Sequence, residues 1–312
     1  MTVTAPLLRS QACSLASLTS PALLQWADPL RPAWDQEGSG APYFVHRKLW
    51  EWLFIVEALH ERGVLAPGRR GLGFGVGREG LASLFASLGC RIVATDQAPG
   101  GAGGWAAVDQ WGGSLDALNH HGICGRELFE ANVSYRTVDM RDIPVDLVGF
   151  DFTWSSCAFE HLGSIAEGVQ FVLDQMRCLR PGGVAVHTTE YNVSSDHATV
   201  EAGDTVLYRR RDLEALAVTL RRQGHEVELD FSLGDTEADR HVDRQPWTGP
   251  HLRLDIGGYV ATSYALVIDK STAGPVVATG RRLATSAAAR ARTAASRLPA
   301  RGSGPHARRH GR

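Results

Sequence analysis

The first residues of the chain that could hold a ligand are three closely spaced glycines, Gly73, Gly75 and Gly77. They follow a short apolar run and precede a segment with helical periodicity, so they stand at an expected strand-to-helix junction. Glycine permits a tight turn there and lets the backbone approach a ligand without a Cβ atom in the way. By itself the motif also fits an ordinary turn in an α/β protein.

An acidic residue at the end of the next apolar run extends this pattern. Asp96 lies 19 residues beyond Gly77, and an acid at that place can accept hydrogen bonds from both ribose hydroxyls of a nucleoside. The combination predicts a cofactor that contains a nucleoside. Because Gly75–Gly80 also satisfies G-x-G-x-x-G, a nicotinamide-dependent oxidoreductase is one alternative.

Polar residues with catalytic potential follow two further apolar runs. Glu160 and His161 come after one expected strand, and Glu190 comes at the end of the next. Such side chains can serve as general bases, and the three together leave a divalent-metal site open as a minor alternative. Since no matched aspartate ligands accompany them, no metal is predicted. His187, in the middle of the second strand, is expected to be a buried core histidine.

An alternation of short apolar runs and amphipathic helices, starting near residue 69, positions these residues. The best-defined helix follows Ser164, which forms an S-x-x-E capping box with Glu167 before apolar residues at helical spacing. The alternation predicts an α/β fold with a mostly parallel sheet. The expected strands lie near 71–75, 91–95, 133–138, 150–155, 184–189, 225–231 and 259–268.

The composition is typical of a globular protein. Hydrophobic residues make up 44% of the chain and charged residues 21%, and no apolar run approaches the roughly 20 residues that cross a bilayer. The N-terminus lacks the charge and apolar pattern of a secretory signal. The five cysteines include no C-x-x-C pair. This usage predicts reduced thiols and a cytoplasmic location.

The charge is unevenly distributed along the chain. Its net value is −2, but residues 271–312 contain nine arginines and no acidic residue. This segment has too little apolar surface to offset the entropy of ordering, so it is expected to be disordered. Nucleic-acid binding through it is a less favoured alternative, because no aromatic residues are interleaved with the arginines.

Three stretches together resemble class I S-adenosylmethionine-dependent methyltransferases. They are LGFGVG at 72–77, FDFTWSSCAFEHL at 150–162 and LRPGG at 179–183. The resemblance covers roughly residues 69–270 and implies a Rossmann-like, seven-stranded, mostly parallel sheet with helices on both faces. It also implies S-adenosyl-L-methionine as the cofactor.

The predicted domain organisation has three parts. Residues 1–68 form an N-terminal helical segment or cap, which includes a helix around Leu49–Leu59. Residues 69–270 form the S-adenosylmethionine-binding methyltransferase domain, and residues 271–312 form the basic disordered tail.

The resemblance assigns eight positions to the cofactor: Gly73, Gly75, Gly77, Asp96, Asp139, Met140, Ser155 and Ser156. The glycines match those that pass beneath the adenosyl and methionine parts, and Asp96 matches the ribose-binding acid. Asp139 matches the acid that receives the adenine amino group, with Met140 beside the ring. The two serines match positions whose backbone lines the methionine part.

The chain departs from the family pattern at one position near the glycines. The family usually has an acid two residues before the first glycine, where this chain has Gly71. Glu79, at the start of the following helix, is a candidate replacement for that acid.

The exit of the fourth strand restricts the substrate. Thr153–Phe159 is not the Asn/Asp-Pro-Pro-aromatic motif of enzymes that methylate nucleobase amino groups or glutamine amides. We therefore expect O-methylation of a hydroxyl on a glycan or small-molecule metabolite. His161 is the expected general base, with the alternative that it is a hydrogen-bonding residue that shapes the cofactor pocket. Glu190 is expected to position the acceptor.

Two further features concern the alternatives. A short-chain nicotinamide enzyme would need Tyr-x-x-x-Lys, but Phe44 and Leu266 precede the two lysines by four residues, so that subclass is excluded.

Trp50 and Trp52 differ by two positions and so face different sides of a helix. Simple packing of both rings is favoured over one ring facing a cleft.

Overall fold

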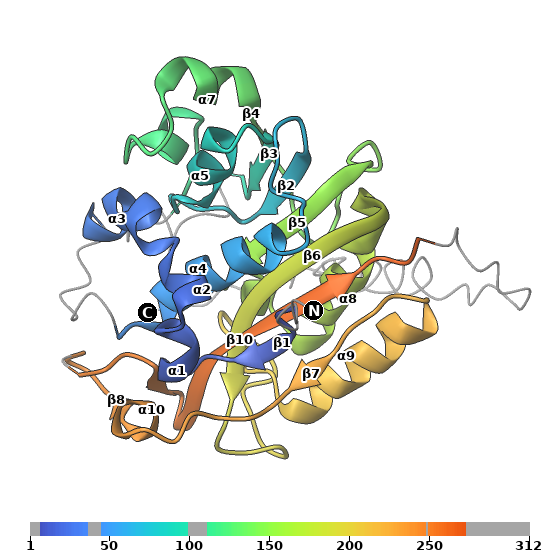
Figure 1. The fold of residues 1–312 in the computed structure, drawn as a ribbon. Helices are drawn as coiled ribbons and strands as arrows, with labels where there is room; N and C mark the ends of the chain where they lie inside the picture. Colours follow the sequence, from blue (N-terminus) through green and yellow to red (C-terminus); the bar gives the residue numbers. More distant parts are fainter. Residues whose placement is uncertain (1–6, 37–44, 99–110, 248, 273–312) are drawn as a thin grey trace, which may run out of the picture. The chain divides into compact units, whose positions relative to one another are not determined.

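The computed structural model describes residues 7–36, 45–98, 111–247 and 249–272. A single sheet of ten strands lies at its centre (Figure 1), in the order β4-β3-β2-β5-β6-β10-β1-β7, with β9 paired to β10 and β8 to β9. The strands are β1 (Ser10–Ala12), β2 (Arg70–Phe74), β3 (Arg91–Asp96), β4 (Val133–Thr137), β5 (Phe150–Ser156), β6 (Leu179–Asn192), β7 (Leu229–Asp230), β8 (Val242–Asp243), β9 (Arg253–Ile256) and β10 (Tyr259–Asp269).

The predicted α/β class is confirmed, but the predicted number of seven strands is wrong. Strands β2 to β6 pair with one another in parallel, and β10 pairs with β6 antiparallel. The strands absent from the prediction are β1, β8 and β9, which are two to four residues long. Strands this short contain too few residues for an alternating pattern to show.

Helices cover both faces of the sheet (Figure 1). They are α1 (Leu15–Leu18), α2 (Pro21–Leu24), α3 (Ala27–Gln36), α4 (Arg47–His60), α5 (Leu81–Ser87), α7 (Arg126–Asn132), α8 (Ile165–Gln175), α9 (Arg210–Arg222) and α10 (Glu237–Arg240). The 3₁₀ helices are η2 (Asp116–Asn119), η3 (Phe159–His161) and η4 (Met176–Cys178).

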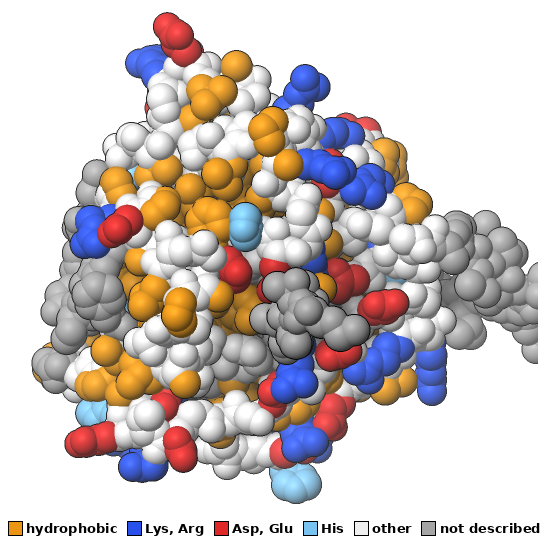
Figure 2. Space-filling model, in the orientation of Figure 1, with side chains coloured by type: hydrophobic (Ala, Val, Ile, Leu, Met, Phe, Trp, Pro, Cys, Tyr) orange, Lys and Arg blue, Asp and Glu red, His pale blue; other side chains and the backbone are white. Residues whose placement is uncertain are grey.

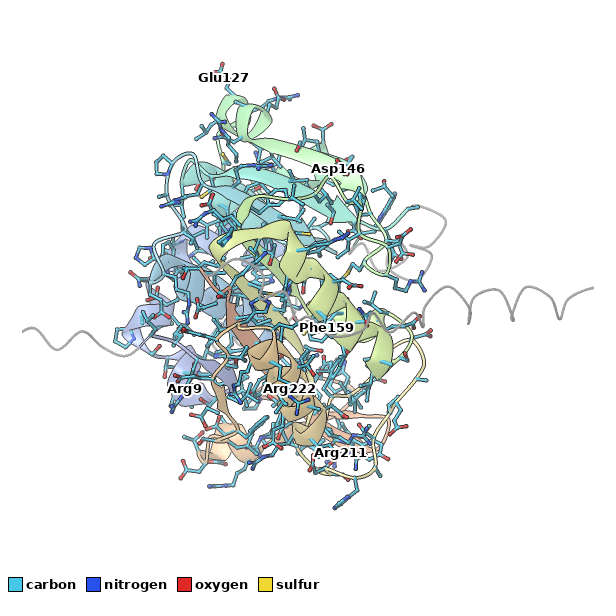
Figure 3. All side chains as sticks on the ribbon, turned by 90° about the vertical axis from the view of Figure 1, so that its right-hand side faces the viewer. Arg9, Glu127, Asp146, Phe159, Arg211 and Arg222 are labelled. Carbon is cyan, nitrogen blue, oxygen red and sulfur yellow. The ribbon has the colours of Figure 1, made fainter. Side chains whose placement is uncertain are left out.

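Two hydrophobic cores separate these helices from the sheet. Phe152 and Trp154 of β5 are two positions apart and so share one face of the sheet, where they join the core that contains α4 and α5. Phe150 lies beyond an irregularity in the register between Phe150 and Phe152, and it joins the core that contains α8 and α9. Figure 3 looks onto this second face, where the labelled Phe159 packs against Phe171 of α8 with ring centroids 6.2 Å apart.

Helix α4 is buried on all sides. It packs on β10, β6 and β5, and α1 and α2 cover its outer side, so every residue from Leu49 to Leu59 is buried. Trp50 and Trp52 are both 0% exposed, and Trp50 Nε1 donates to Ser17 Oγ at 2.9 Å. Neither ring faces a cleft, which confirms the packing interpretation.

Two other expectations concern the region of α8 and β6. Ser164 caps α8, because its hydroxyl accepts the Glu167 N–H at 3.2 Å. The Glu167 carboxylate accepts from the Ser164 hydroxyl at 3.4 Å, so only the serine half of the predicted capping box is formed. The segment Leu179–Gly183, expected to be a turn before the strand, instead forms the first part of β6. An irregular register between β5 and β6 near Phe152 accommodates it.

The elements described above belong to one compact unit that extends to Pro275. The predicted disordered tail lies outside the described residues apart from Ser271 and Thr272, and the boundary between residues 68 and 69 stays a prediction. In the part of the chain that the structure describes, no helix has the length and apolar character needed to span a membrane.

Candidate active site

The candidate site lies at the topological switch point of the sheet, between β2 and β5, where the strand order changes direction. From β2 the chain moves outward through β3 and β4, and β5 then begins the other half of the sheet beside β2. In open α/β sheets, ligands bind beyond the carboxyl ends of the strands at this switch point. The residues that follow β2 and β5 are therefore the first place to look for a site.

The three predicted glycines have two different roles. A Cβ atom at Gly73 would lie 2.4 Å from the ring of Trp154, so this glycine permits β2 and β5 to pack closely. Gly75 and Gly77 have φ values of +56° and +54°, a left-handed conformation that favours glycine. A Cβ at Gly75 would also lie 2.9 Å from Ala158, so the turn leaves no room for a side chain.

A cavity of about 650 Å³ opens beside this turn, within the usual size range of small-molecule sites. It is lined by Lys48, Gly75, Gly77, Arg78, Glu79, Asp96, Gln97, Ala98, Trp111, Thr137, Val138, Asp139, Met140, Arg141, Ser156, Cys157, Ala158, His161 and Leu162. Seven of the ten predicted site residues are among them. The other three, Gly73, Ser155 and Glu190, are not.

Asp96, at the end of β3, joins the cavity wall to the glycine turn. Its Oδ2 accepts the N–H groups of Gly77 at 3.0 Å and Gly112 at 3.3 Å, and its Oδ1 accepts the N–H of Gln97 at 2.7 Å. Burial raises the pKa of this carboxyl above its ordinary value, although the three donors oppose the shift. The side chain is thus fixed at the place predicted for a ribose contact.

Asp139 and Met140 follow β4 on the same side of the cavity. The Arg141 side chain donates two hydrogen bonds to the Asp139 carboxylate, at 2.9 and 3.0 Å, and its backbone N–H donates a third at 2.9 Å; together they lower the pKa of Asp139. The neighbouring Trp111 donates from Nε1 to the Gln97 carbonyl at 3.1 Å. Apolar and aromatic side chains with fixed polar neighbours are typical of a site for a heteroaromatic ring.

Ser155 and His187 form a buried pair outside the cavity lining. Ser155 Oγ lies 2.8 Å from His187 Nδ1, and the histidine is fully buried between neighbouring strands. Burial lowers the pKa of His187 to about 3. It is therefore the neutral core histidine that the sequence predicted.

His161 lies at the end of η3 and its side chain reaches the cavity. Its Nδ1 is 2.7 Å from the carbonyl oxygen of Asp204. A carbonyl can only accept, so Nδ1 carries the hydrogen and the lone pair of the neutral ring is on Nε2. Nε2 lies 3.9 Å from Glu160 Oε1.

A group of charged residues from α4, which sequence reasoning missed, borders the cavity. Lys48 Nζ lies 3.0 Å from Glu51 and 3.5 Å from Glu79, and Arg47 lies 2.6 Å from Glu190. Glu51 is fully buried and also accepts from Ser156 Oγ at 3.1 Å. Three charged residues within the first five positions of a mostly apolar helix were the available signal.

These ion pairs change the acidity of the groups involved. Burial opposes the charge of Glu51, but Lys48 and Arg47 outweigh it and lower the pKa of this carboxyl to about 2. Burial likewise opposes the charge of Lys48, yet Glu51 raises its pKa well above the ordinary value. Both groups are therefore charged at neutral pH, and Lys48 presents a cation to the cavity.

Cys157, one of the five cysteines predicted to be reduced thiols, also lines the cavity. It follows β5 directly and has a φ of +46°, a strained value for a residue other than glycine. Its N–H donates to Thr188 Oγ1 at 3.0 Å. Burial raises the pKa of its thiol well above the usual range.

A comparison with protein families agrees with this site. Residues 72–187 match the sequence profile described as a methyltransferase domain. The match runs from β2 into β6 and includes every cavity-lining residue except Lys48. No curated protein matches the chain.

Several solved structures are similar to this chain at low sequence identity. One described as a sarcosine dimethylglycine methyltransferase from Galdieria sulphuraria is 18% identical, with a TM-score of 0.45 over 72% of this chain and 86% of that one. The 4+2 cyclase SpnF is 17% identical, with a TM-score of 0.46 over 85% and 100%. The magnesium protoporphyrin IX methyltransferase of Synechocystis PCC 6803 is 12% identical, with a TM-score of 0.43 over 70% and 80%.

The match shows a methyltransferase domain over residues 72–187 of the chain. The cofactor of this domain is S-adenosylmethionine, and the residues present fit that group. The turn at Gly75 has no room for a Cβ, and Asp96 presents a carboxylate beside it. Lys48, Arg78 and Glu79 give the same cavity charges of both signs, which suits a zwitterionic amino-acid moiety.

Proposed function

We propose that the protein transfers a methyl group from S-adenosylmethionine to a hydroxyl of a glycan or small-molecule metabolite. When bound, the cofactor supplies an electrophilic methyl group on a sulfonium. The single observation that carries the choice of a hydroxyl acceptor is the position of His161. Its ring lines the cavity with the hydrogen fixed on Nδ1 and the lone pair on Nε2.

The cofactor-binding roles follow from the cavity wall. Gly75 and Gly77 allow close approach of the backbone, and Asp96 accepts hydrogen bonds from ribose. Asp139 and Met140 border the adenine.

The charged residues then suit the methionine end of the cofactor. Glu79 would pair with the amino group, and Lys48 and Arg78 with the carboxylate. In this assignment Glu79 replaces the acid that the family usually has at the position of Gly71. Gly73 and Ser155 act indirectly by holding the ends of β2 and β5.

The acceptor is activated by removal of its hydroxyl proton. A general base contributes about 10²–10⁴-fold when it lies within hydrogen-bonding reach of that proton, and His161 Nε2 is the base in this proposal. Holding the hydroxyl in line with the methyl group supplies a further part of the acceleration. Contact between Glu190 and the acceptor stays a prediction, because its carboxylate is bound to Arg47 outside the cavity lining.

The test starts with a search for the acceptor. The full-length protein is incubated with S-adenosylmethionine that carries a deuterated methyl group and with a panel of glycans and hydroxylated metabolites. Mass spectrometry with fragmentation then locates the label. The proposal expects the label on oxygen, and a product labelled on nitrogen or carbon would contradict it.

The second part of the test concerns the base. His161→Ala is expected to lower kcat by about 10²–10⁴-fold while the affinity for S-adenosylhomocysteine stays the same. Protonation of the imidazole removes its lone pair, so the acidic limb of the pH–rate profile should also disappear. His197→Ala, at an exposed histidine, is the matched control. A parallel loss of rate and cofactor affinity would instead show that His161 only shapes the pocket.

A further inference from the structure

Three potential metal ligands converge at the carboxyl ends of β5 and β6. The Cys157 sulfur, a carboxylate oxygen of Glu160 and a carboxylate oxygen of Glu190 all lie within 4.8 Å of one another. Cys157 and Glu160 follow β5, and Glu190 lies near the end of β6. Because β5 and β6 are parallel neighbours, the sheet itself holds the three side chains together.

Both carboxylates have an unsatisfied oxygen in a buried position. Glu160 is 0% exposed; its Oε2 accepts from Thr189 Oγ1 at 3.2 Å, and its Oε1 has no hydrogen-bond partner among the described residues. Glu190 is 5% exposed; its Oε1 binds Arg47, and its Oε2 has no such partner. A buried carboxylate oxygen without a partner is unfavourable, so both residues point to a ligand that would neutralise them.

The charges around these residues indicate the sign of that ligand. Three buried carboxylates, Glu51, Glu160 and Glu190, face two cations, Arg47 and Lys48. The imidazole of His161, which is neutral when it acts as a base, lies 3.9 Å from Glu160. The group therefore has an excess of negative charge when all three acids are ionised. A divalent cation bound through one thiolate would make the group neutral.

We propose that Cys157, Glu160 and Glu190 bind one Zn²⁺ ion. Zinc accepts a thiolate together with carboxylate oxygens, and three protein ligands leave a fourth position for water or a substrate. Thiolate ligation favours zinc over magnesium or calcium, which prefer sites made of oxygen ligands alone. Because Cys157 also lines the cavity, an oxygen of a molecule bound there could occupy the fourth position.

The geometry is compatible with this assignment after a small movement. Ligand atoms 2.0–2.3 Å from a tetrahedral ion are about 3.3–3.8 Å apart, so the observed spacing must contract by about 1 Å. Rotation of two glutamate side chains can supply that change. This site differs from the sequence alternative of Glu160, His161 and Glu190, because the third ligand is the thiol.

Protonation of Glu160 is the alternative to a metal ion as a way to satisfy the carboxylates of Glu160 and Glu190. Burial raises the pKa of this carboxyl, and the nearby charge of Glu190 adds to the shift. A protonated Glu160 could donate to Glu190 and leave no need for a metal. The experiment must therefore measure the metal directly and not through enzymatic activity.

The test uses the untagged full-length protein, stripped of metal and then titrated with Zn²⁺ in competition with a chromogenic chelator. We expect about one tightly bound zinc per chain in the wild type and in the control Cys90→Ser, whose thiol donates to the Ala66 carbonyl away from the site. Cys157→Ser and Glu160→Gln should each weaken the binding by at least about tenfold. Circular dichroism checks that each variant is folded.

Substitution with Co²⁺ gives an independent readout. A thiolate bound to Co²⁺ produces a charge-transfer band in the near ultraviolet, which we expect in the wild type and not in Cys157→Ser. Absence of tight zinc binding in the wild type would overturn the proposal and favour the proton on Glu160. Equal zinc binding by the wild type and both variants would also overturn it, because the ion would then lie elsewhere. If Cys157→Ser does not fold, the wild-type cobalt spectrum and Glu160→Gln still decide the question.

Discussion

Among single residues, Asp96 has a structural role in the glycine turn and a proposed role in binding the cofactor. Its carboxylate already accepts N–H groups from Gly77, Gly112 and Gln97, so it shapes the turn that surrounds the cavity. The same carboxylate lies in the cavity wall, where a ribose would meet it. Loss of this side chain should therefore affect the cofactor through direct contacts and through the turn.

Asp96→Ala is predicted to weaken cofactor binding strongly. Each hydrogen bond from a hydroxyl to a charged carboxylate contributes roughly 1.5–3 kcal/mol, so the Kd for S-adenosylhomocysteine should rise about 10- to 1000-fold. Calorimetric titration measures this change, with Asp146→Ala as the control at an exposed aspartate paired to Arg136. An unchanged Kd in Asp96→Ala would remove Asp96 from the ribose site.

The cavity contains residues that the sequence could predict and residues that it could not. Gly75, Gly77 and Asp96 are recognisable because their roles depend on backbone conformation and on spacing along adjacent strands. Lys48 and Cys157 were missed for a physical reason. Their surroundings arise only when α4 packs against the ends of β5 and β6, and no local pattern records that contact.

At the scale of elements, α4 combines the hydrophobic core with the charged side of the site. Its apolar residues fill the core beneath α1 and α2, while Arg47, Lys48 and Glu51 reach the ends of β5 and β6. Glu51 is fully buried, and Arg47 and Lys48 balance its charge. Because Glu51 lies on α4 and can be protonated, the stability of the fold is expected to depend on pH.

The pKa of Glu51 predicts how that stability changes with pH. Its pKa is lowered from 4.5 to about 2 in the folded protein. The stabilisation is therefore fully present above pH 4.5 and is lost as the pH falls toward 2. The shift corresponds to about 3 kcal/mol at neutral pH.

Glu51→Gln tests this prediction because glutamine keeps the shape but not the charge. Its free energy of unfolding should be lower than that of the wild type at pH 7, and the difference should shrink between pH 4.5 and pH 2. Denaturant unfolding at a series of pH values measures both curves. A difference that stays constant over this range would show that the charge of Glu51 does not contribute.

The longer elements were predictable, and the shortest were not. Strands β2 to β6 and helices α4, α8 and α9 have enough residues for apolar periodicity to define them. In contrast, β1 is three residues long and inserts between β10 and β7. Its place depends on pairing with residues more than 200 positions away, which a local pattern does not contain.

At the scale of the whole molecule, we predict that the chain after the compact unit ending at Pro275 is dispensable for cofactor binding. Residues 276–312 contain nine arginines, no acid and few large apolar side chains, so their removal should cost little packing energy. A chain truncated after Pro275 should keep its Kd for S-adenosylhomocysteine and melt within a few degrees of the full-length protein. A larger fall in Tm would assign these residues to the fold.

The central claim is that the cavity between the Gly75 turn and the end of β5 holds S-adenosylmethionine. Calorimetric titration of the full-length protein with S-adenosylhomocysteine, and separately with NADH, tests it most directly. We expect a single saturable site for S-adenosylhomocysteine and no binding of NADH. Saturable binding of NADH without any response to S-adenosylhomocysteine would contradict it.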